Sequence, residues 1–224
     1  MEAEIIAGLL GNRSAFTKKY MRFISEDKKT TCEECKKYDK MVFAANDINK
    51  PTIPIHPNCR CYYQILYLDT TKKTAKFRVD EPGTGFSGET FYGREELLEK
   101  LETGYAPRTV THLIIINHGE HPGQFELGSR SESFELLTDR QILRLKRHLA
   151  PNALIELRMC YGIANHNGEQ VVQELANKLQ CRIKAYANEV SPYGTRPFIA
   201  KNRHLSYWNK IFADSGEKIF YPQK

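Results

Sequence analysis

The sequence lacks an apolar run that approaches the roughly 20 residues of a membrane-spanning helix, so we expect a protein without a membrane span. A basic segment ahead of an apolar run is missing as well, because the short apolar run at residues 5–10 follows Glu2 and Glu4, and we expect that this run is no general secretion signal. We therefore expect a protein that is cytoplasmic in the producing cell and reaches any target cell by a route other than the general secretory one.

Low-complexity tracts and a dominant charge of one sign are absent as well. The apolar fraction of 41% is sufficient for a buried core. The 33 Lys and Arg residues outnumber the 27 Asp and Glu residues only slightly, and the excess is spread along the chain. This pattern indicates a solvated surface and disfavours a nucleic-acid partner.

The cysteines divide the chain into two parts. Four of them lie near the N-terminus, while Cys160 and Cys181 stand alone further along. We expect an N-terminal region of helices and a cysteine-rich knuckle at residues 1–66, and an α/β hydrolase domain at residues 67–224. Cys181 follows an expected helix and has no candidate catalytic or metal-binding residues beside it in the sequence, so we expect it in the core.

The N-terminal region has helical spacing of apolar residues. The spacing predicts one helix with a stripe at residues 5–10 and a second one capped by Ser14, which carries Phe16, Tyr20 and Phe23. Three prolines between Cys32 and Cys61 indicate a loop or knuckle. Residues 62–68 and 75–79 are typical of strands, and we expect a hairpin that turns at residues 70–73.

The second part alternates between strand and helix patterns. A short charged helix is expected at residues 94–102. The regular elements that follow are strands at 112–116, 153–159 and 182–187 and helices at 139–149 and 169–179. This order predicts a mostly parallel sheet covered by helices. Thr138 and Gln141 have capping-box spacing at the start of one helix.

Chemically active residues follow two of these strands. His118 and Gly119 come after the strand at 112–116, and Cys160 comes after the strand at 153–159. The carboxyl ends of parallel strands share one edge of a sheet, so a histidine base and a thiol nucleophile would meet there if the strands are neighbours. Glycine lets backbone N–H groups face a substrate carbonyl, and Gly119 and Cys160 could form an oxyanion hole. The alternative is a buried thiol beside a hydrogen-bonded turn histidine.

An apolar strand ending in His-Gly, followed about 40 residues later by a strand ending in Cys, resembles the caspase-like cysteine peptidases. The resemblance spans roughly residues 111–197 and implies a three-layer sandwich, a protein or peptide substrate, and a Cys-His dyad of Cys160 and His118 without an obligatory third member. Met159 stands where the family often has a small residue. Glu189 and Ser191 occupy the place of the substrate pocket, and Glu189 there would favour Lys or Arg before the cut.

The N-terminal cysteines have the spacing of a metal site. Cys32 and Cys35 form a CxxC pair, and His56, Cys59 and Cys61 follow in the run HPNCRC, which gives five donors for a four-coordinate zinc ion. Disulfides and unliganded thiols remain alternatives. The same run resembles the C-terminal segment of phage head morphogenesis (minor capsid) proteins, which implies a phage-derived or secreted effector or toxin.

Other functions remain open at this point. A Cys-His pair can also serve deamidation or transacylation, and a non-catalytic virion or interaction module would use the knuckle alone. An anionic activator could bind the basic residues Arg140, Arg144, Lys146 and Arg147, although a solvated helix face is the plainer interpretation. Residues 83–88 match GxGxxG in form, but no helix is expected before residue 94, so we interpret them as a loop.

Overall fold

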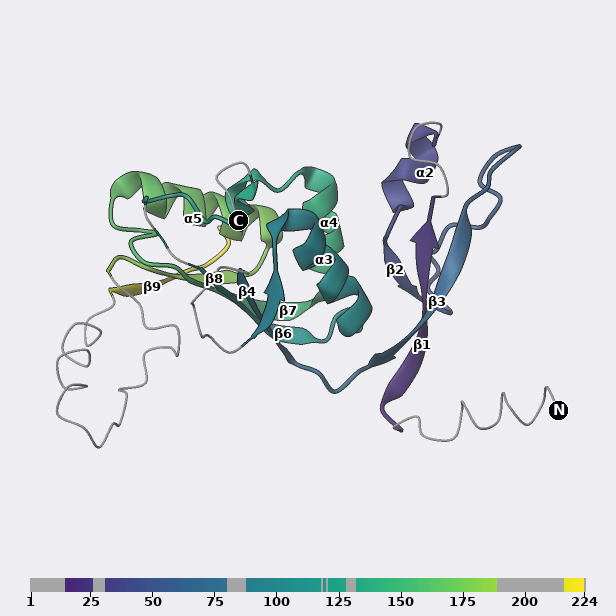
Figure 1. Ribbon diagram of the computed structural model, residues 1–224, viewed down its shortest axis with the longest axis horizontal. Helices are drawn as coiled ribbons and strands as arrows, with labels where there is room; N and C mark the ends of the chain where they lie inside the picture. The colour runs from purple at the N-terminus through teal and green to yellow at the C-terminus, as the bar shows by residue number, and fades with distance from the viewer. Residues whose placement is uncertain are drawn as a thin grey trace.

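The computed structural model describes residues 15–25, 31–79, 88–117, 119, 121–127, 132–188 and 216–223. These residues form two sheets that lie in separate lobes (Figure 1). We call the described part up to Asp69 the small lobe and the described part from Thr74 onward the large lobe. None of the helices in these ranges is both long and apolar enough to cross a membrane.

The small lobe contains a three-stranded antiparallel sheet of order β2-β1-β3. Its strands are β1 (Thr17–Ile24), β2 (Val42–Ala44) and β3 (Tyr62–Asp69), and helix α2 (Glu33–Tyr38) lies between β1 and β2 in the chain. The predicted helix capped by Ser14 is therefore wrong over β1. That segment pairs with β3 along its whole length and with β2 on its other side, and backbone bonds on both sides outweigh a local helical spacing.

The hairpin expected between residues 62–68 and 75–79 is also wrong. Both segments are strands, but β3 pairs with β1 in the small lobe, whereas β4 (Thr74–Val79) pairs with β5 (Glu89–Phe91) and β6 (Val110–Ile116) in the large lobe. The turn at residues 70–73 thus connects two sheets (Figure 1). The first predicted helix, at residues 5–10, lies outside the described residues.

The large lobe is built on a six-stranded sheet of order β5-β4-β6-β7-β8-β9. Strands β5, β4, β6, β7 (Leu149–Arg158) and β8 (Arg182–Tyr186) are parallel, and β9 (Glu217–Phe220) is antiparallel to β8. The predicted α/β class with a mostly parallel sheet is confirmed.

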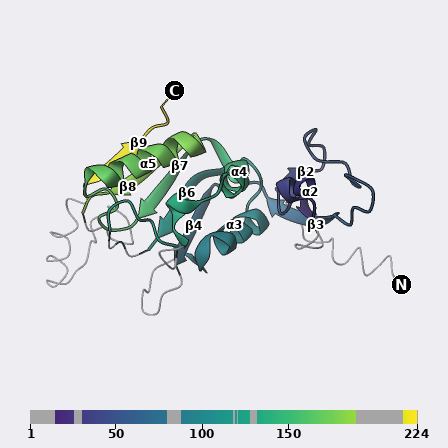
Figure 2. The same cartoon turned by 90° about the horizontal axis from the view of Figure 1, so that it is seen from above.

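Three helices cover one face of this sheet. They are α3 (Gly93–Gly104), α4 (Asp139–His148) and α5 (His166–Leu179), and both views show them over the same face (Figures 1 and 2). Alternate strand residues such as Leu113, Ile155 and Ile183 join their apolar sides in one continuous core. The third layer of the predicted sandwich stays a prediction.

Two features predicted from the sequence of the large lobe are the capping box of α4 and the burial of Cys181. The Thr138 hydroxyl accepts a hydrogen bond from the backbone N–H of Gln141, and the Gln141 side chain accepts one from the backbone N–H of Thr138, so the capping box of α4 is confirmed. Cys181 is 3% exposed within the core, as expected. Burial raises the pKa of its thiol to about 12, which keeps it protonated and unreactive.

Candidate active site and cysteine cluster

Strands β6 and β7 are adjacent and parallel, with Ile116 opposite Arg158 at their carboxyl ends. The backbone N–H of Asn117 continues this pairing with a 3.3 Å hydrogen bond to the carbonyl of Arg158. The segments that contain Gly119 and Cys160 therefore leave the sheet at the same edge. This adjacency is the geometric condition on which a Cys-His pair at this edge depends.

Gly119 lies directly against the backbone of Cys160. A Cβ atom built on Gly119 would lie 1.9 Å from the carbonyl oxygen of Cys160 and 2.7 Å from its nitrogen. No side chain fits there, because backbone atoms cannot move aside as the end of a flexible side chain can. The glycine that follows His118 is thus required by the close approach of the two chain segments.

The turn that carries Cys160 is attached to the end of β8. The backbone N–H of Tyr161 donates to the carbonyl of Asn188 at 3.2 Å, and that of Ile163 donates to the carbonyl of Tyr186 at 3.1 Å. Tyr161 has a φ of 59°, a left-handed conformation that a non-glycine residue adopts only when its surroundings hold it. The partly exposed Cys160 thus sits on a turn that neighbouring backbone fixes in place.

Several predicted site residues lie outside the described residues. These are the expected base His118, the expected pocket residues Glu189 and Ser191, and most of the glycine-rich loop. Two further histidines belong to the described residues that follow β6 and β7: His121 is exposed, and His166 is the first residue of α5.

The sequence analysis did not predict a buried polar network that is centred on β7. Glu156 is 4% exposed on the sheet face opposite the helices. It accepts hydrogen bonds from Arg158 at 2.9 Å and from the Tyr186 hydroxyl, and it contacts His112 Nε2 at 3.0 Å. Burial disfavours its charge, but these partners outweigh burial and hold the pKa of the carboxyl far below its usual range. An acid inside the apolar strand ALIELR was the available signal.

The N-terminal cysteines come together as predicted. Cys35, which is 1% exposed, lies 3.2 Å from Nε2 of His56 and 3.8 Å from Sγ of Cys59. The donor atoms form two mutually close groups that share Cys35, namely Cys32, Cys35 and His56, and Cys35, Cys59 and Cys61. This Cys/His cluster could hold a metal ion.

Contacts with the local backbone orient the donor atoms of these side chains. Cys32 is the N-cap of α2, and its Sγ accepts the backbone N–H of Cys35 at 3.4 Å. His56 Nδ1 lies 2.8 Å from the carbonyl of Pro57, which leaves Nε2 directed at the thiols, as a histidine ligand requires. Burial opposes ionisation of Cys59, but hydrogen bonds with the backbone of Ile55 and Cys61 outweigh it and lower its pKa to about 7. The loop prediction holds for residues 45–61, whereas α2 and β2 occupy the start of the region.

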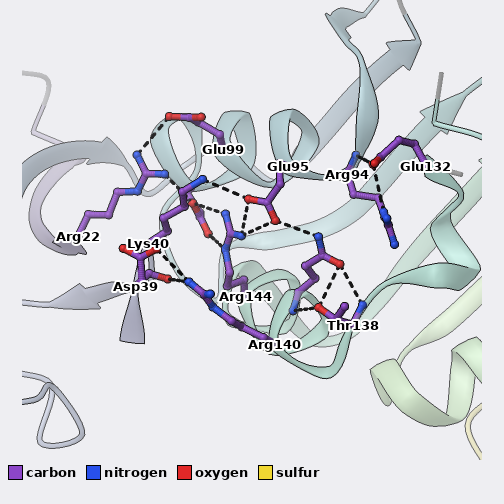
Figure 3. A network of polar contacts seen from close by, with 12 residues as sticks. Arg22, Asp39, Lys40, Arg94, Glu95, Glu99, Glu132, Thr138, Arg140 and Arg144 are labelled. Carbon is purple, nitrogen blue, oxygen red and sulfur yellow. Dashed lines mark hydrogen bonds and ion pairs between the residues drawn. The ribbon is translucent and has the colours of Figure 1, made fainter. Parts of the chain in front are cut away.

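The basic side of α4 is not a solvated face. Arg144 is 2% exposed and pairs with Glu95 at 2.9 Å (Figure 3). It also pairs with Glu102 at 2.6 Å. Arg140 pairs with Asp39 of the small lobe at 3.0 Å. These arginines already have carboxylate partners. The partners are remote in the sequence, so no local sequence pattern predicted the ion pairs. An anionic activator that binds there stays a prediction.

No protein-family model, curated protein or solved structure matches the chain.

Proposed function

We propose that this chain is a cysteine peptidase in which Cys160 is the nucleophile and His118 is its general base. The observation that supports this most is the shared edge of β6 and β7, where the backbone of Gly119 packs on that of Cys160. Binding and catalytic groups of parallel α/β sheets gather at the carboxyl ends of strands, which is the edge in question.

The proposed reaction is acyl transfer in two steps. His118 takes the proton of the Cys160 thiol, and the thiolate sulfur attacks the carbonyl carbon of the scissile peptide bond. The backbone N–H groups of Gly119 and Cys160 stabilise the oxyanion, and the C–N bond then breaks as His118 returns the proton to the leaving amine. Water, deprotonated by His118, hydrolyses the thioester and releases the acid product and the free thiol.

The biological setting that we propose follows from the two resemblances seen in the sequence. The peptidase would be the catalytic part of a phage-derived or bacterial effector, which acts on a protein target or on its own chain. Glu189 would favour Lys or Arg before the cut. Deamidation and transacylation use the same thioester and differ only in the leaving group or in the acceptor that replaces water.

We also propose zinc as the ion of the Cys/His cluster. Thiolate and imidazole donors suit zinc, and a CxxC pair that starts a short helix is a common way to present two thiolates to one ion. The cluster lies in the small lobe, away from Cys160 in the chain and in a different sheet, so the zinc ion would serve structure instead of catalysis.

Intact-mass spectrometry with peptide acyloxymethyl ketones tests the peptidase directly. Ketones that end in Lys, Arg, Leu or Asp are incubated with the wild type and with the Cys160→Ala and Cys181→Ala variants. We expect one adduct in the wild type and in Cys181→Ala and none in Cys160→Ala. Peptide amide substrates then separate the reactions, because hydrolysis adds the mass of water across a cleaved bond, whereas transacylation transfers the acyl group to an amine. The absence of an adduct with every ketone would contradict the peptidase proposal.

A further inference from the structure

Helices α3 and α4 present two facing rows of opposite charge. The acidic row on α3 comprises Glu95, Glu99 and Glu102, and the basic row on α4 comprises Arg140, Arg144 and Arg147. Both rows have the i, i+4, i+7 spacing that places residues on one side of a helix. Arg144 joins the rows, because its guanidinium binds Glu95 (Figure 3) and also Glu102.

The small lobe contributes the matching charges. Its cations contact the acidic row: Arg22 lies 2.9 Å from Glu102 and 3.5 Å from Glu99, and Lys40 lies 3.2 Å from Glu95. The cations of the small lobe thus form ion pairs with the same acidic row that Arg144 of α4 binds. Arg22 and Glu102 are each almost fully buried, so this contact is part of the packed interior.

The acids of the small lobe contact the basic row in the same way. Asp39 binds Arg140 at 3.0 Å, and Asp47 binds Arg147 at 2.8 Å. Arg147 also donates to the carbonyl of Val42 at 2.8 Å and stacks on the ring of Phe43. The interface therefore combines directional polar contacts, which need both lobes in a fixed geometry, with a small apolar group that joins Val42 and Leu68 to Ala106 of the large lobe.

A short path connects this interface to the cysteine cluster. Cys35 lies within α2, and Asp39 and Lys40 follow the end of that helix directly. Tyr38 packs with Phe23 and Phe43 in a small apolar group that also contacts Cys61. The position of α2 thus sets the position of both interface residues, and Cys32 at its N-cap and Cys35 within it are ligands of the proposed metal.

We propose that a zinc ion bound at the Cys/His cluster holds the small lobe against α3 and α4, so that removal of the ion releases the lobe from these helices. The inference rests on the proposed zinc site and not on the peptidase. Its physical basis is that the buried apolar residues of the small lobe belong to only two small groups, one of which is completed by Ala106 of the large lobe, so that metal binding would supply folding energy that such a lobe lacks.

Zero-length carbodiimide cross-linking measures the contact itself. The reagent joins a lysine and a carboxylate only when they touch, and Lys40 and Glu95 from the two lobes do so at 3.2 Å. The pair Lys218 and Glu169, 2.9 Å apart within the large lobe, is the internal reference in the same digest. We expect the ratio of the two cross-links to fall about tenfold, a common size of coupling, when the zinc-loaded protein is stripped with a chelator. Added zinc should restore the ratio.

Matched variants separate the metal from general damage. Cys35→Ser should lower the cross-link ratio without chelator, whereas Cys181→Ser, which alters a buried thiol of the large lobe, should leave it unchanged. Native mass spectrometry records the bound metal in each sample. The proposal is overturned if the chain binds no zinc, or if zinc leaves while the Lys40–Glu95 ratio stays constant. Neither readout uses Cys160, so failure of the peptidase proposal would be seen separately.

Discussion

The large lobe and the small lobe are stabilised by different interactions. In the large lobe, buried strand and helix residues form one continuous apolar core that extends from β4 to β9. In the small lobe, the buried apolar residues belong to two minor groups, one of which includes Ala106 of the large lobe, and the three-stranded sheet is accompanied by the cysteine cluster and by ion pairs with α3 and α4. Burial of apolar surface stabilises the large lobe, whereas the stability of the small lobe depends more on a few metal-binding and charged side chains.

Metal removal should separate the lobes most strongly. Structural zinc sites contribute on the order of 10 kcal/mol to the folding of small domains, so a chelator should unfold the small lobe while the large lobe keeps its structure. Hydrogen–deuterium exchange would then show faster exchange in β1 and β3 and unchanged exchange in β6 and β7. Equal loss of protection in both sheets would contradict a difference between the lobes.

Glu102→Gln probes the buried charges between the lobes. The change leaves Arg22 and Arg144 without their shared carboxylate, and breaking a buried ion pair costs about 3–5 kcal/mol of unfolding free energy. Glu99→Gln is the matched control, because Glu99 is 54% exposed and its contact with Arg22 is longer, so a loss below about 1 kcal/mol is expected. Urea unfolding of both variants checks this, and similar losses would show that burial does not decide the effect.

The stability of the large lobe should depend on pH through His148. Its ring is 1% exposed, and burial lowers its pKa to about 4, from 6.5 in the unfolded chain. The unfolded chain therefore binds more protons as the pH falls through this range. The contribution is complete above pH 6.5 and is lost toward pH 4, and it amounts to about 3 kcal/mol at most.

Urea unfolding at pH 7 and pH 4.5 measures this slope in the wild type, in His148→Gln and in His121→Gln. Partial desolvation disfavours the charge of the half-exposed Glu95, but hydrogen bonds from Arg144 and Gln141 outweigh it and lower its pKa to about 2. The contribution of Glu95 is therefore lost only below about pH 4.5 and does not disturb the window. The slope should flatten in His148→Gln and persist in His121→Gln. An unchanged slope in His148→Gln would contradict the assignment.

The smallest expected effect concerns the start of α4. Thr138→Ala removes the hydroxyl that accepts the Gln141 N–H, and the loss of such a cap costs about 1 kcal/mol. Thr103→Ala is the control: Thr103 lies inside α3 and bonds back to the carbonyl of Glu99, and alanine is a better helix former there. Thermal unfolding should show a lower midpoint for Thr138→Ala alone.

The sequence predicted the large lobe better than the small one for a physical reason. The cap of α4, the stripe of α5 and the apolar run of β6 are local signals, and the core that they form needs no partner outside the lobe. In β1, Tyr20 and Phe23 fit a helical stripe as well as a strand, and only the remote partner β3 decides between them.

The candidate site shows the same division. The shared edge of β6 and β7 followed from strand order, and the cysteine cluster followed from ligand spacing. The engagement of Arg144 with Glu102 was missed, because a charged residue on a helix is usually solvated and its partner lies 42 positions away in the chain. Glu156 was missed although a single acid in an apolar strand could have indicated a buried network.

The most direct test of the active site is the rate at which a peptide acyloxymethyl ketone modifies Cys160 in His118→Ala and in His121→Ala. A general base typically contributes about a hundredfold or more, so we predict a loss of that size in His118→Ala and an unchanged rate in His121→Ala. Equal rates in the two variants, or a Cys160 that reacts no faster than Cys181, would contradict a Cys160–His118 pair at the shared edge of β6 and β7.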